Sequence, residues 1–394
     1  MFGIFYSSLV LLLSGPFEFE KFEAISITSL FLGLHFSLPI IGGVVAKKIK
    51  FGMLLVTGKI FQLLGIVMIL MSSANIDLVF LGMAFFLLDS SVSTVSLNML
   101  IGNKYKQEEL EGRGKAFLGA HVWTNIGFSL AFTVSGICFA SASPLSLLYV
   151  ASSVSMLCFL VSVFLFSSGI KFHEKNIAFL LGALLSVTAV FHLLKNTNAS
   201  RWGVISSAML GAALLILMSF RSSSRQEKVK QIKFTLFAFL SVVFWSIYML
   251  GPTLVPLLLQ KNVNKYVMGF DLPTQWIQLA SPLFVVTLGG WLSKKRNFFV
   301  LGTNFFIGIT CAVLSLFFIL FAYSNNNVEL YIILVGILLL SAGETFLAPT
   351  SMALPGTLIR AKWQPAYMAI IQLSLGVGVV LSSEIYKYIT ILNI

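Results

Sequence analysis

The chain has 394 residues, and its composition excludes a soluble globular protein, because 58% of the residues are hydrophobic and only 10% are charged. Soluble domains have about 25% charged residues, so this sequence has too little polar surface to solvate a globule. The net charge of +12 does not indicate nucleic-acid binding, since Lys and Arg occupy short loops between apolar runs and form no basic face. The composition predicts a helical protein that crosses a lipid bilayer many times.

A dozen apolar runs are long enough to cross a bilayer, which takes about 20 such residues. In chain order they cover 24–46, 51–71, 78–101, 116–140, 145–168, 177–194, 202–220, 234–259, 273–293, 298–322, 328–354 and 364–386. An earlier stretch, 2–14, would rise only about 20 Å as a helix, so it is expected to form part of a span. Most Lys and Arg residues lie in alternate loops, and the positive-inside rule places these loops in the cytoplasm.

A short motif of two glycines followed by two lysines occurs twice, in segments 42–48 and 289–295. The first copy consists of Gly42, Gly43, Lys47 and Lys48, a candidate gating or loop motif. Both copies end a predicted span on the cytoplasmic side, which is typical of carriers built from two halves of the same orientation. We therefore expect an N-terminal helical bundle over 1–170, two inserted helices with a cytoplasmic linker over 171–233, and a C-terminal bundle over 234–394.

Ionisable residues inside predicted spans are costly to bury and are therefore candidates for function. Glu344 lies mid-span between Gly343 and Pro349, two residues that allow a helix to open near a ligand. Its carboxylate either binds a substrate ammonium group or a proton, or is a neutral group in the bundle. Asp89 is also mid-span, and it either pairs with Lys59 of the neighbouring span or lines a central cavity.

Two histidines and one asparagine are further polar residues within predicted spans. His35 and His121 either relay protons or form packing hydrogen bonds. Asn125 either makes a helix–helix hydrogen bond or contacts a ligand. The three cysteines stand singly, and no catalytic triad, HExxH motif or true nucleotide-binding loop occurs. We therefore predict neither an enzyme nor a bound cofactor or metal.

Several segments resemble the proton-dependent oligopeptide transporter (POT) family of the major facilitator superfamily. The matching segments are Thr124–Gly127, Phe244-Trp245, Met268–Pro282, Gly343-Glu344 with Pro349, and the Gly42-Gly43 turn. Bacterial members of this family have fourteen helices, two of them inserted between six-helix halves. The resemblance implies an all-α polytopic membrane protein of the major facilitator fold. About thirteen of the fourteen helices are expected, with the first partial and the last core helix missing.

The resemblance also implies roles for single residues in substrate binding. Glu344 matches the glutamate that holds the peptide amino terminus, Asn125 an asparagine that contacts the peptide backbone, and Trp245 a pocket-lining tryptophan. Tyr6 matches the last tyrosine of the first-helix motif, and Ser281 stands in place of an asparagine before the eighth-helix proline.

The chain departs from the family at positions that couple protons and hold the peptide carboxylate. The first-helix motif ExxERFxYY is missing, because Met1 and Phe2 stand where its last Glu and Arg belong. Met249 replaces the seventh-helix carboxylate, and Asp89 replaces the fourth-helix lysine. The remaining candidates for proton coupling are Glu344, Asp89, His35 and His121.

The sequence thus predicts a carrier in the bacterial inner membrane that is monomeric and has the lipid bilayer and a small peptide or other solute as partners. It would work by alternating access and resemble proton–peptide symporters, although the usual proton carriers are replaced. Burying a peptide carboxylate unpaired beside Asp89 would cost several kcal/mol. Two alternatives therefore stay open: a carrier for an amine or other cationic solute, and a remnant that no longer transports.

Overall fold

The computed structural model describes residues 2–45, 49–72, 75–106, 109–141, 143–166, 174–220, 224–295 and 300–391. The helices of the first part are α1 (Phe2–Ser14), α2 (Lys21–Ser37), α3 (Pro39–Val45), α4 (Phe51–Leu70), α5 (Ile76–Gly102), α6 (Leu110–Ala140) and α7 (Ser146–Phe166). Two helices follow, α8 (Glu174–Lys195) and α9 (Thr197–Phe220). The last part contains α10 (Arg225–Tyr248), α11 (Leu250–Thr253), α12 (Val255–Lys261), α13 (Thr274–Gln278), α14 (Ala280–Leu292), α15 (Leu301–Ser324), α16 (Leu330–Leu358), the 3-10 helix η2 (Ala361–Trp363) and α17 (Gln364–Ile391).

Within these described ranges, nine helices are long and apolar enough to cross a membrane. Two shorter apolar helices, Gly182–Lys195 and Arg201–Leu217, lie in the predicted insert. The chain is therefore an all-α polytopic membrane protein, as predicted. Several of the dozen predicted runs are divided between helices, although the divided segments Glu23–Gly42 and Arg225–Lys261 are each still long and apolar enough to cross a membrane.

Proline explains where two of these runs divide. The run 24–46 breaks at Leu38, and Pro39 is the first residue of α3. The run 234–259 breaks twice, and Pro256 is the second residue of α12. A proline ring clashes with the carbonyl group four residues earlier, so proline is favoured in the first turn of a helix. The run 273–293 is also divided, at Leu279 between α13 and α14.

Helix α16 is closed around Glu344, where Gly343 and Pro349 were expected to allow an opening near a ligand. It is continuous from Leu330 to Leu358 although Pro349 and Pro355 lie inside it. Near Pro349, a hydroxyl group donates a hydrogen bond to a backbone carbonyl oxygen one turn earlier: Thr350 Oγ1 donates to Phe346 O at 2.7 Å. Packing against neighbouring helices also lets membrane helices accommodate proline without unwinding, and α16 packs on α15, α14 and α6.

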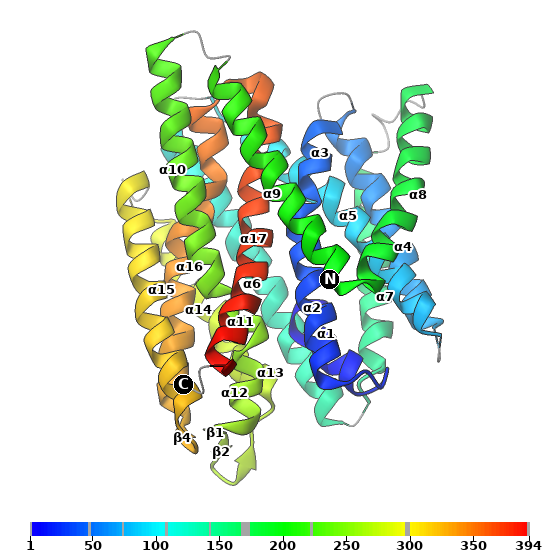
Figure 1. The fold of residues 1–394 in the computed structure, drawn as a ribbon, viewed down its shortest axis with the longest axis vertical. Coiled ribbons are helices and arrows are strands. Elements are labelled where there is room, and N and C mark those ends of the chain that lie inside the picture. Colours follow the sequence, from blue (N-terminus) through cyan, green and yellow to red (C-terminus); the bar gives the residue numbers. More distant parts are fainter. Residues whose placement is uncertain are drawn as a thin grey trace.

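The helices form two groups, and Figure 1 shows α10, α15 and α16 on one side of the molecule, α3, α4, α5 and α7 on the other, and α6 and α17 between them. We use the name N-terminal group for α1–α7 and C-terminal group for α10–α17. The groups touch where α2 and α3 pack against α17, and where α6 packs against α14 and α16. Of the two inserted helices, α8 packs on α5, whereas α9 contacts both α2 and α17.

Glycine permits two close helix contacts within the N-terminal group. A Cβ atom at Gly82 of α5 would lie 2.5 Å from Gly65 O of α4, so only glycine fits at this crossing. A Cβ atom at Gly42 would overlap Ser91 O of α5. Gly42 therefore lies at a helix contact, and both Gly42 and Gly43 lie within α3. Lys47 and Lys48 lie outside the described residues.

Short strands lie at the end of the molecule opposite the start of α10 (Figure 1). They are β1 (Val263–Asn264), β2 (Tyr266–Val267), β3 (Phe270–Asp271) and β4 (Val328–Glu329). Strands β2 and β3 are antiparallel, and the turn between them has φ of 49° at Met268 and 90° at Gly269. Two positive φ angles fit a type I′ hairpin turn. Strand β1 pairs in parallel with β4.

At the predicted cytoplasmic end, the two groups touch through an arginine and an apolar cluster. Arg113 is buried, and its Nη2 donates to Tyr105 O at 2.8 Å and Lys106 O at 3.3 Å. Its guanidinium group lies against Gly356 of α16, where a Cβ atom would overlap it. The apolar cluster contains Ile40, Val95, Met99, Phe117, Ala353, Met368, Ala369 and Leu373.

Candidate functional site

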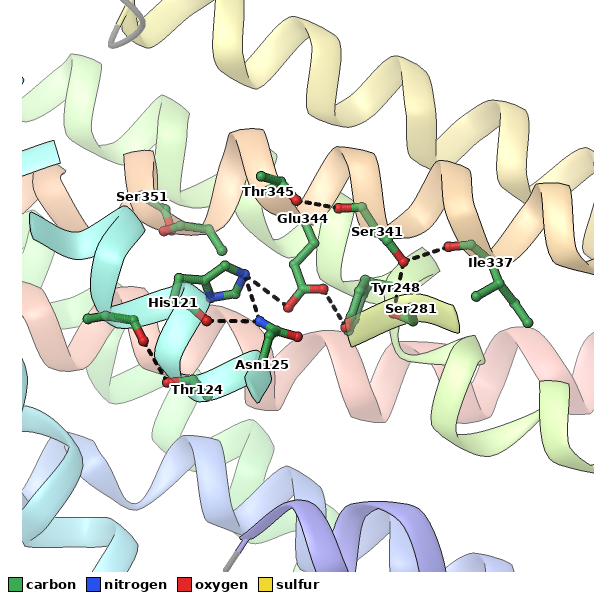
Figure 2. Close-up of polar contacts among 12 residues, drawn as sticks. His121, Thr124, Asn125, Tyr248, Ser281, Ile337, Ser341, Glu344, Thr345 and Ser351 are labelled. Atoms are coloured by element: carbon green, nitrogen blue, oxygen red, sulfur yellow. Dashed lines mark hydrogen bonds and ion pairs between the residues drawn. The ribbon is translucent and has the colours of Figure 1, made fainter. Parts of the chain in front are cut away.

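Glu344 lies near the middle of α16 and is 7% exposed. Its Oε2 accepts a hydrogen bond of 2.7 Å from the Tyr248 hydroxyl, and its Oε1 lies 3.4 Å from His121 Nε2. Figure 2 shows these side chains pointing toward one another from α16, α10 and α6. The carboxylate is thus held by polar groups from both helix groups.

His121 and Asn125 are four residues apart on α6, so they lie on the same face of the helix. Asn125 Nδ2 donates to His121 O at 3.0 Å and lies 3.4 Å from His121 Nε2. Asn125 is buried, at 4% exposure. These contacts lie within α6 and are not the predicted helix–helix hydrogen bond, whereas the predicted contact of Asn125 with a ligand stays a prediction.

Helix α10 places Trp245 and Tyr248 on one face, three residues apart. Their ring centroids are 5.0 Å apart at an interplanar angle of 83°, an edge-to-face contact. Trp245 is 3% exposed, and its Nε1 has no hydrogen-bond partner among the described residues. Phe244 stacks on Tyr248, with centroids 5.8 Å apart.

Tyr6 of α1 reaches the same place from the N-terminal group. Its side chain is hydrogen bonded to that of Tyr248. Its ring makes an edge contact with Phe128 of α6, with centroids 5.2 Å apart. Four helices therefore contribute to one polar cluster, which we name the Glu344 cluster: Tyr6, His121, Asn125, Tyr248 and Glu344.

Ser281 lies beside this cluster rather than in it. Its Oγ accepts a 2.8 Å hydrogen bond from Ser341 Oγ, which connects α14 to α16 (Figure 2). Ser341 is three residues before Glu344, one turn along α16. Thr345 Oγ1 donates to Ser341 O at 2.8 Å. The predicted site residue Ser281 therefore contacts α16 one helical turn before Glu344.

Asp89 is not part of the cluster and forms an ion pair instead. Its Oδ2 lies 2.8 Å from Lys59 Nζ and accepts from Gln62 Nε2 at 2.8 Å, while Ser93 Oγ donates to Oδ1. The pairing alternative for Asp89 is therefore confirmed.

A second contact of α5 shows on which face of this helix Asp89 lies. Asn98 Nδ2 lies 3.8 Å from Met352 Sδ of α16. Nine positions separate Asp89 from Asn98, and at about 100° per residue they lie on opposite faces of the helix. Asp89 thus faces α4, where Lys59 pairs with its charge, and the expected repulsion of a peptide carboxylate by Asp89 stays a prediction.

His35 is also separate from the Glu344 cluster. Its ring lies among aromatic side chains of α2 and α5, with centroids 6.4 Å from Phe31 and 6.2 Å from Phe86. Its carbonyl oxygen accepts a hydrogen bond from Ser90 Oγ of α5. Of the four proton-coupling candidates, Glu344 and His121 therefore contact each other, whereas His35 and Asp89 both interact with Lys59.

The Glu344 cluster is acidic in character. Among the ion pairs of the described residues, His121 is the only basic partner of Glu344, and no Lys or Arg pairs with it. In the part of the chain that the structure describes, no three His, Cys, Asp or Glu side chains gather where they would hold a metal ion. A buried carboxylate of this kind suits an ammonium group or a proton.

Sequence reasoning missed Tyr248, the residue with the shortest contact to Glu344. A signal for it was present, since Tyr248 lies three residues after Trp245 and must share its helix face. A tyrosine in a span is otherwise an ordinary packing residue, and only the position of α10 against α16 makes it a partner of the carboxylate.

No protein-family profile matches the chain. The peptide transporter YePEPT of Yersinia enterocolitica is 27% identical over 162 residues, which are 38% of this chain and 32% of that protein. Dipeptide and tripeptide permease A of Pectobacterium carotovorum is 23% identical over 287 residues, 70% of this chain and 56% of the permease. The chain therefore spans a third to just over half of the lengths of these two relatives.

Solved structures match over nearly the whole chain. A POT family transporter in complex with 5-aminolevulinic acid has a TM-score of 0.80 at 18% identity, covering 99% of this chain and 88% of that one. A mutant of peptide transporter POT in complex with alafosfalin has a TM-score of 0.76 at 19% identity, with coverage of 98% and 85%. The chain thus has the fold of POT family transporters and resembles peptide transporters in sequence, which confirms the predicted resemblance.

Proposed function

We propose that this protein is a secondary carrier for small peptides or similar solutes, and that Glu344 binds the substrate ammonium group. The observation behind this proposal is the Glu344 cluster, which joins side chains of α1 and α6 to side chains of α10 and α16. A substrate bound to Glu344 would contact both helix groups. That arrangement suits alternating access, in which two bundles rock around a site at mid-membrane depth.

The names of the relatives and the fold support this proposal. The relatives with matching sequence are named as a peptide transporter and as dipeptide and tripeptide permeases. In the same proposal, the chain acts in a bacterial inner membrane as a monomer and not as an enzyme. The three segments expected from the sequence would then move as two bundles connected by the insert α8–α9.

A second candidate is a carrier for amines that have no carboxylate. The absence of Lys or Arg from the ion pairs of Glu344, within the described residues, favours it. The nearest intramembrane lysine, Lys59, binds Asp89 on the face of α5 that is turned away from α16. Within the described residues, a substrate carboxylate would therefore find His121, and no Lys or Arg paired with Glu344, at the Glu344 cluster.

The proposal is tested with Glu344→Gln in proteoliposomes. Labelled dialanine is exchanged against unlabelled dialanine inside, at equal pH on both sides. Loss of a hydrogen bond to a charged group costs about 1.5–3 kcal/mol, so the half-saturating concentration is expected to rise roughly 10- to 150-fold. Glu329→Gln, at the start of the same helix and exposed, is the matched control and should resemble the wild type.

Unchanged exchange by folded Glu344→Gln protein would contradict the assigned role. Competition with dialaninamide distinguishes the two substrates, because this amide has the ammonium group but no carboxylate. Stronger inhibition by dialaninamide than by dialanine would favour the amine carrier. Absence of all exchange by folded wild-type protein would favour the remnant that no longer transports.

A further inference from the structure

We propose that the side-chain amides of Asn98 and Gln372 bind the carboxylate of a peptide whose ammonium group is bound by Glu344. This assignment rests on the proposed function, because it assumes a substrate held at Glu344. It adds a second subsite with its own chemistry, and it makes the substrate a zwitterion of about dipeptide length rather than an amine without a carboxylate.

Two amide groups from different helix groups meet at one sulfur atom. Gln372 Nε2 of α17 donates to Met352 Sδ at 3.3 Å, and Asn98 Nδ2 of α5 lies 3.8 Å from the same atom. Gln372 is 4% exposed, and Asn98 is half-buried. The structure shows no other hydrogen bond of these two side chains to a described residue. We name Asn98 and Gln372 the amide pair.

The sulfur atom of Met352 is a poor partner for the amide pair. A thioether accepts hydrogen bonds only weakly, whereas each amide group has two N–H donors. A carboxylate has two oxygen atoms that only accept, and its hydrogen bonds are about twice as strong as those between neutral groups. The Met352 side chain is unbranched and flexible, so it can move aside for a ligand. A carboxylate would therefore use donors that the thioether leaves largely unused.

The spacing along α16 matches a short peptide. Met352 comes eight residues after Glu344, about 12 Å along the helix axis. An extended dipeptide spans at most about 7 Å, and a hydrogen bond of about 2.8 Å at each end brings the total to 12–13 Å. The two positions differ by about 80° around the axis, so they lie on the same half of α16. A dipeptide lying along α16 can therefore contact Glu344 and the amide pair together.

The helix segments that carry the amide pair and Met352 contain no acidic residue that would repel an anion. Segments 90–102 of α5, 345–358 of α16 and 364–383 of α17 contain neither Asp nor Glu. The next acid of α5, Asp89, forms its ion pair on the face opposite Asn98. A carboxylate at the amide pair would thus meet hydrogen-bond donors from both helix groups.

A buried cation lies one helical turn beyond Met352. The guanidinium group of Arg113 packs on Gly356, four residues after Met352 and about 6 Å along α16. Arg113 is 3% exposed, and a charge in such surroundings acts more strongly on its neighbours than one in water. It favours an anion at the amide pair without giving up its hydrogen bonds to Tyr105 O and Lys106 O.

The test compares two ligands that differ at one end. Dialanine has an ammonium group and a carboxylate, whereas dialaninamide has only the ammonium group. Dissociation constants are measured by isothermal titration calorimetry with purified protein in detergent, after size-exclusion chromatography shows that each variant is folded. Wild-type protein is expected to bind dialanine at least about 10-fold more tightly than dialaninamide, as expected for a hydrogen bond to a charged group.

Variants of the amide pair should change the binding of one ligand only. Asn98→Leu and Gln372→Leu are each expected to weaken dialanine binding about 10-fold or more and to leave dialaninamide binding unchanged. Gln372→Glu should reverse the preference, because its carboxylate repels that of dialanine. Asn325→Leu is the matched control, since this exposed amide bonds to its own helix and should not affect either ligand.

Met352→Leu separates ligand binding from packing at the same place. It removes the sulfur atom that the two amides contact and leaves both amides in position. It is expected to bind dialanine at least as tightly as the wild type. If Met352→Leu and the amide-pair variants all weakened both ligands alike, the amides would have a packing role, and the inference would be overturned.

Two further results would overturn the inference: equal binding of dialanine and dialaninamide by wild-type protein, and an unchanged preference for dialanine in both leucine variants. The proposed function fails differently. If Glu344→Gln bound both ligands like the wild type while the leucine variants lost the preference, the ammonium site would be refuted and the carboxylate site would stand. Folded wild-type protein that bound neither ligand would end both proposals.

Discussion

The ion pair between Lys59 and Asp89 predicts a measurable contribution to stability. Lys59 Nζ and Asp89 Oδ2 are 2.8 Å apart, and the two side chains are 19% and 6% exposed. Replacing Lys59 by Met leaves the carboxylate with Gln62 and Ser93 as donors and no cation. Breaking a buried ion pair from one side costs about 3–5 kcal/mol, and the partial exposure of Lys59 favours the lower end, about 3 kcal/mol.

The double variant Lys59→Met/Asp89→Leu removes both charges at once. Replacing a buried pair by apolar side chains is often neutral, so this variant is expected to unfold with nearly the wild-type free energy. The double-mutant cycle should then give a coupling of at least about 3 kcal/mol, the cost of Lys59→Met plus the cost of Asp89→Leu alone. Lys195→Met is the matched control, because its pair with Asp77 is exposed at 41% and 61% and should contribute less than about 1 kcal/mol.

The assay is reversible unfolding in mixed micelles with increasing SDS, followed by circular dichroism and tryptophan fluorescence. The reasoning is refuted if Lys59→Met costs as little as the exposed control. It is also refuted if the two single substitutions simply add in the double variant, because that would mean that the two charges stabilise the fold independently.

Two further predictions concern the site and the packing of the helices. Tyr248→Phe removes the 2.7 Å hydrogen bond to Glu344, and the half-saturating concentration for dialanine exchange should rise about fivefold, the equivalent of about 1 kcal/mol; tighter binding would show that Tyr248 competes with substrate. Gly82→Leu should prevent folding, measured as loss of the monodisperse peak in size-exclusion chromatography, because its Cβ would lie 2.5 Å from Gly65 O; Gly119→Leu, with no atom within 4 Å of the added Cβ, is the control and should fold normally.

The helical membrane fold was predictable from sequence because span length and loop charge are properties of single segments. Glu344 was predictable for a similar reason, since a carboxylate in an apolar run is costly wherever the helix points. Tyr248 was not predictable, because its hydrogen bond depends on how α10 lies against α16. The direction of Asp89 depends on the rotation of α5 about its axis, which neither hydropathy nor spacing specifies.

The structural effect of a proline was harder to predict from the sequence than the effect of a charged residue in an apolar run. Pro39 and Pro256 lie where helices begin, whereas Pro349 and Pro355 lie inside the continuous α16. The same residue type thus ends one helix and is accommodated in another, because neighbouring hydroxyl groups and helices differ. Gly343 and Pro349 therefore allow an opening near Glu344 without producing one in this structure.

The contact between the two helix groups around Arg113 is expected to depend on temperature. Its hydrogen bonds to Tyr105 O and Lys106 O stay within the N-terminal group, so these two bonds need not break when α6 separates from α16. Separation would instead expose to water the surface of Gly356 that the Arg113 guanidinium group covers. It would also expose the apolar cluster around Phe117 and Ala353. Burial of apolar surface away from water weakens on cooling. The population in which this end is closed is therefore expected to fall at low temperature, while the hydrogen bonds of Arg113 remain formed.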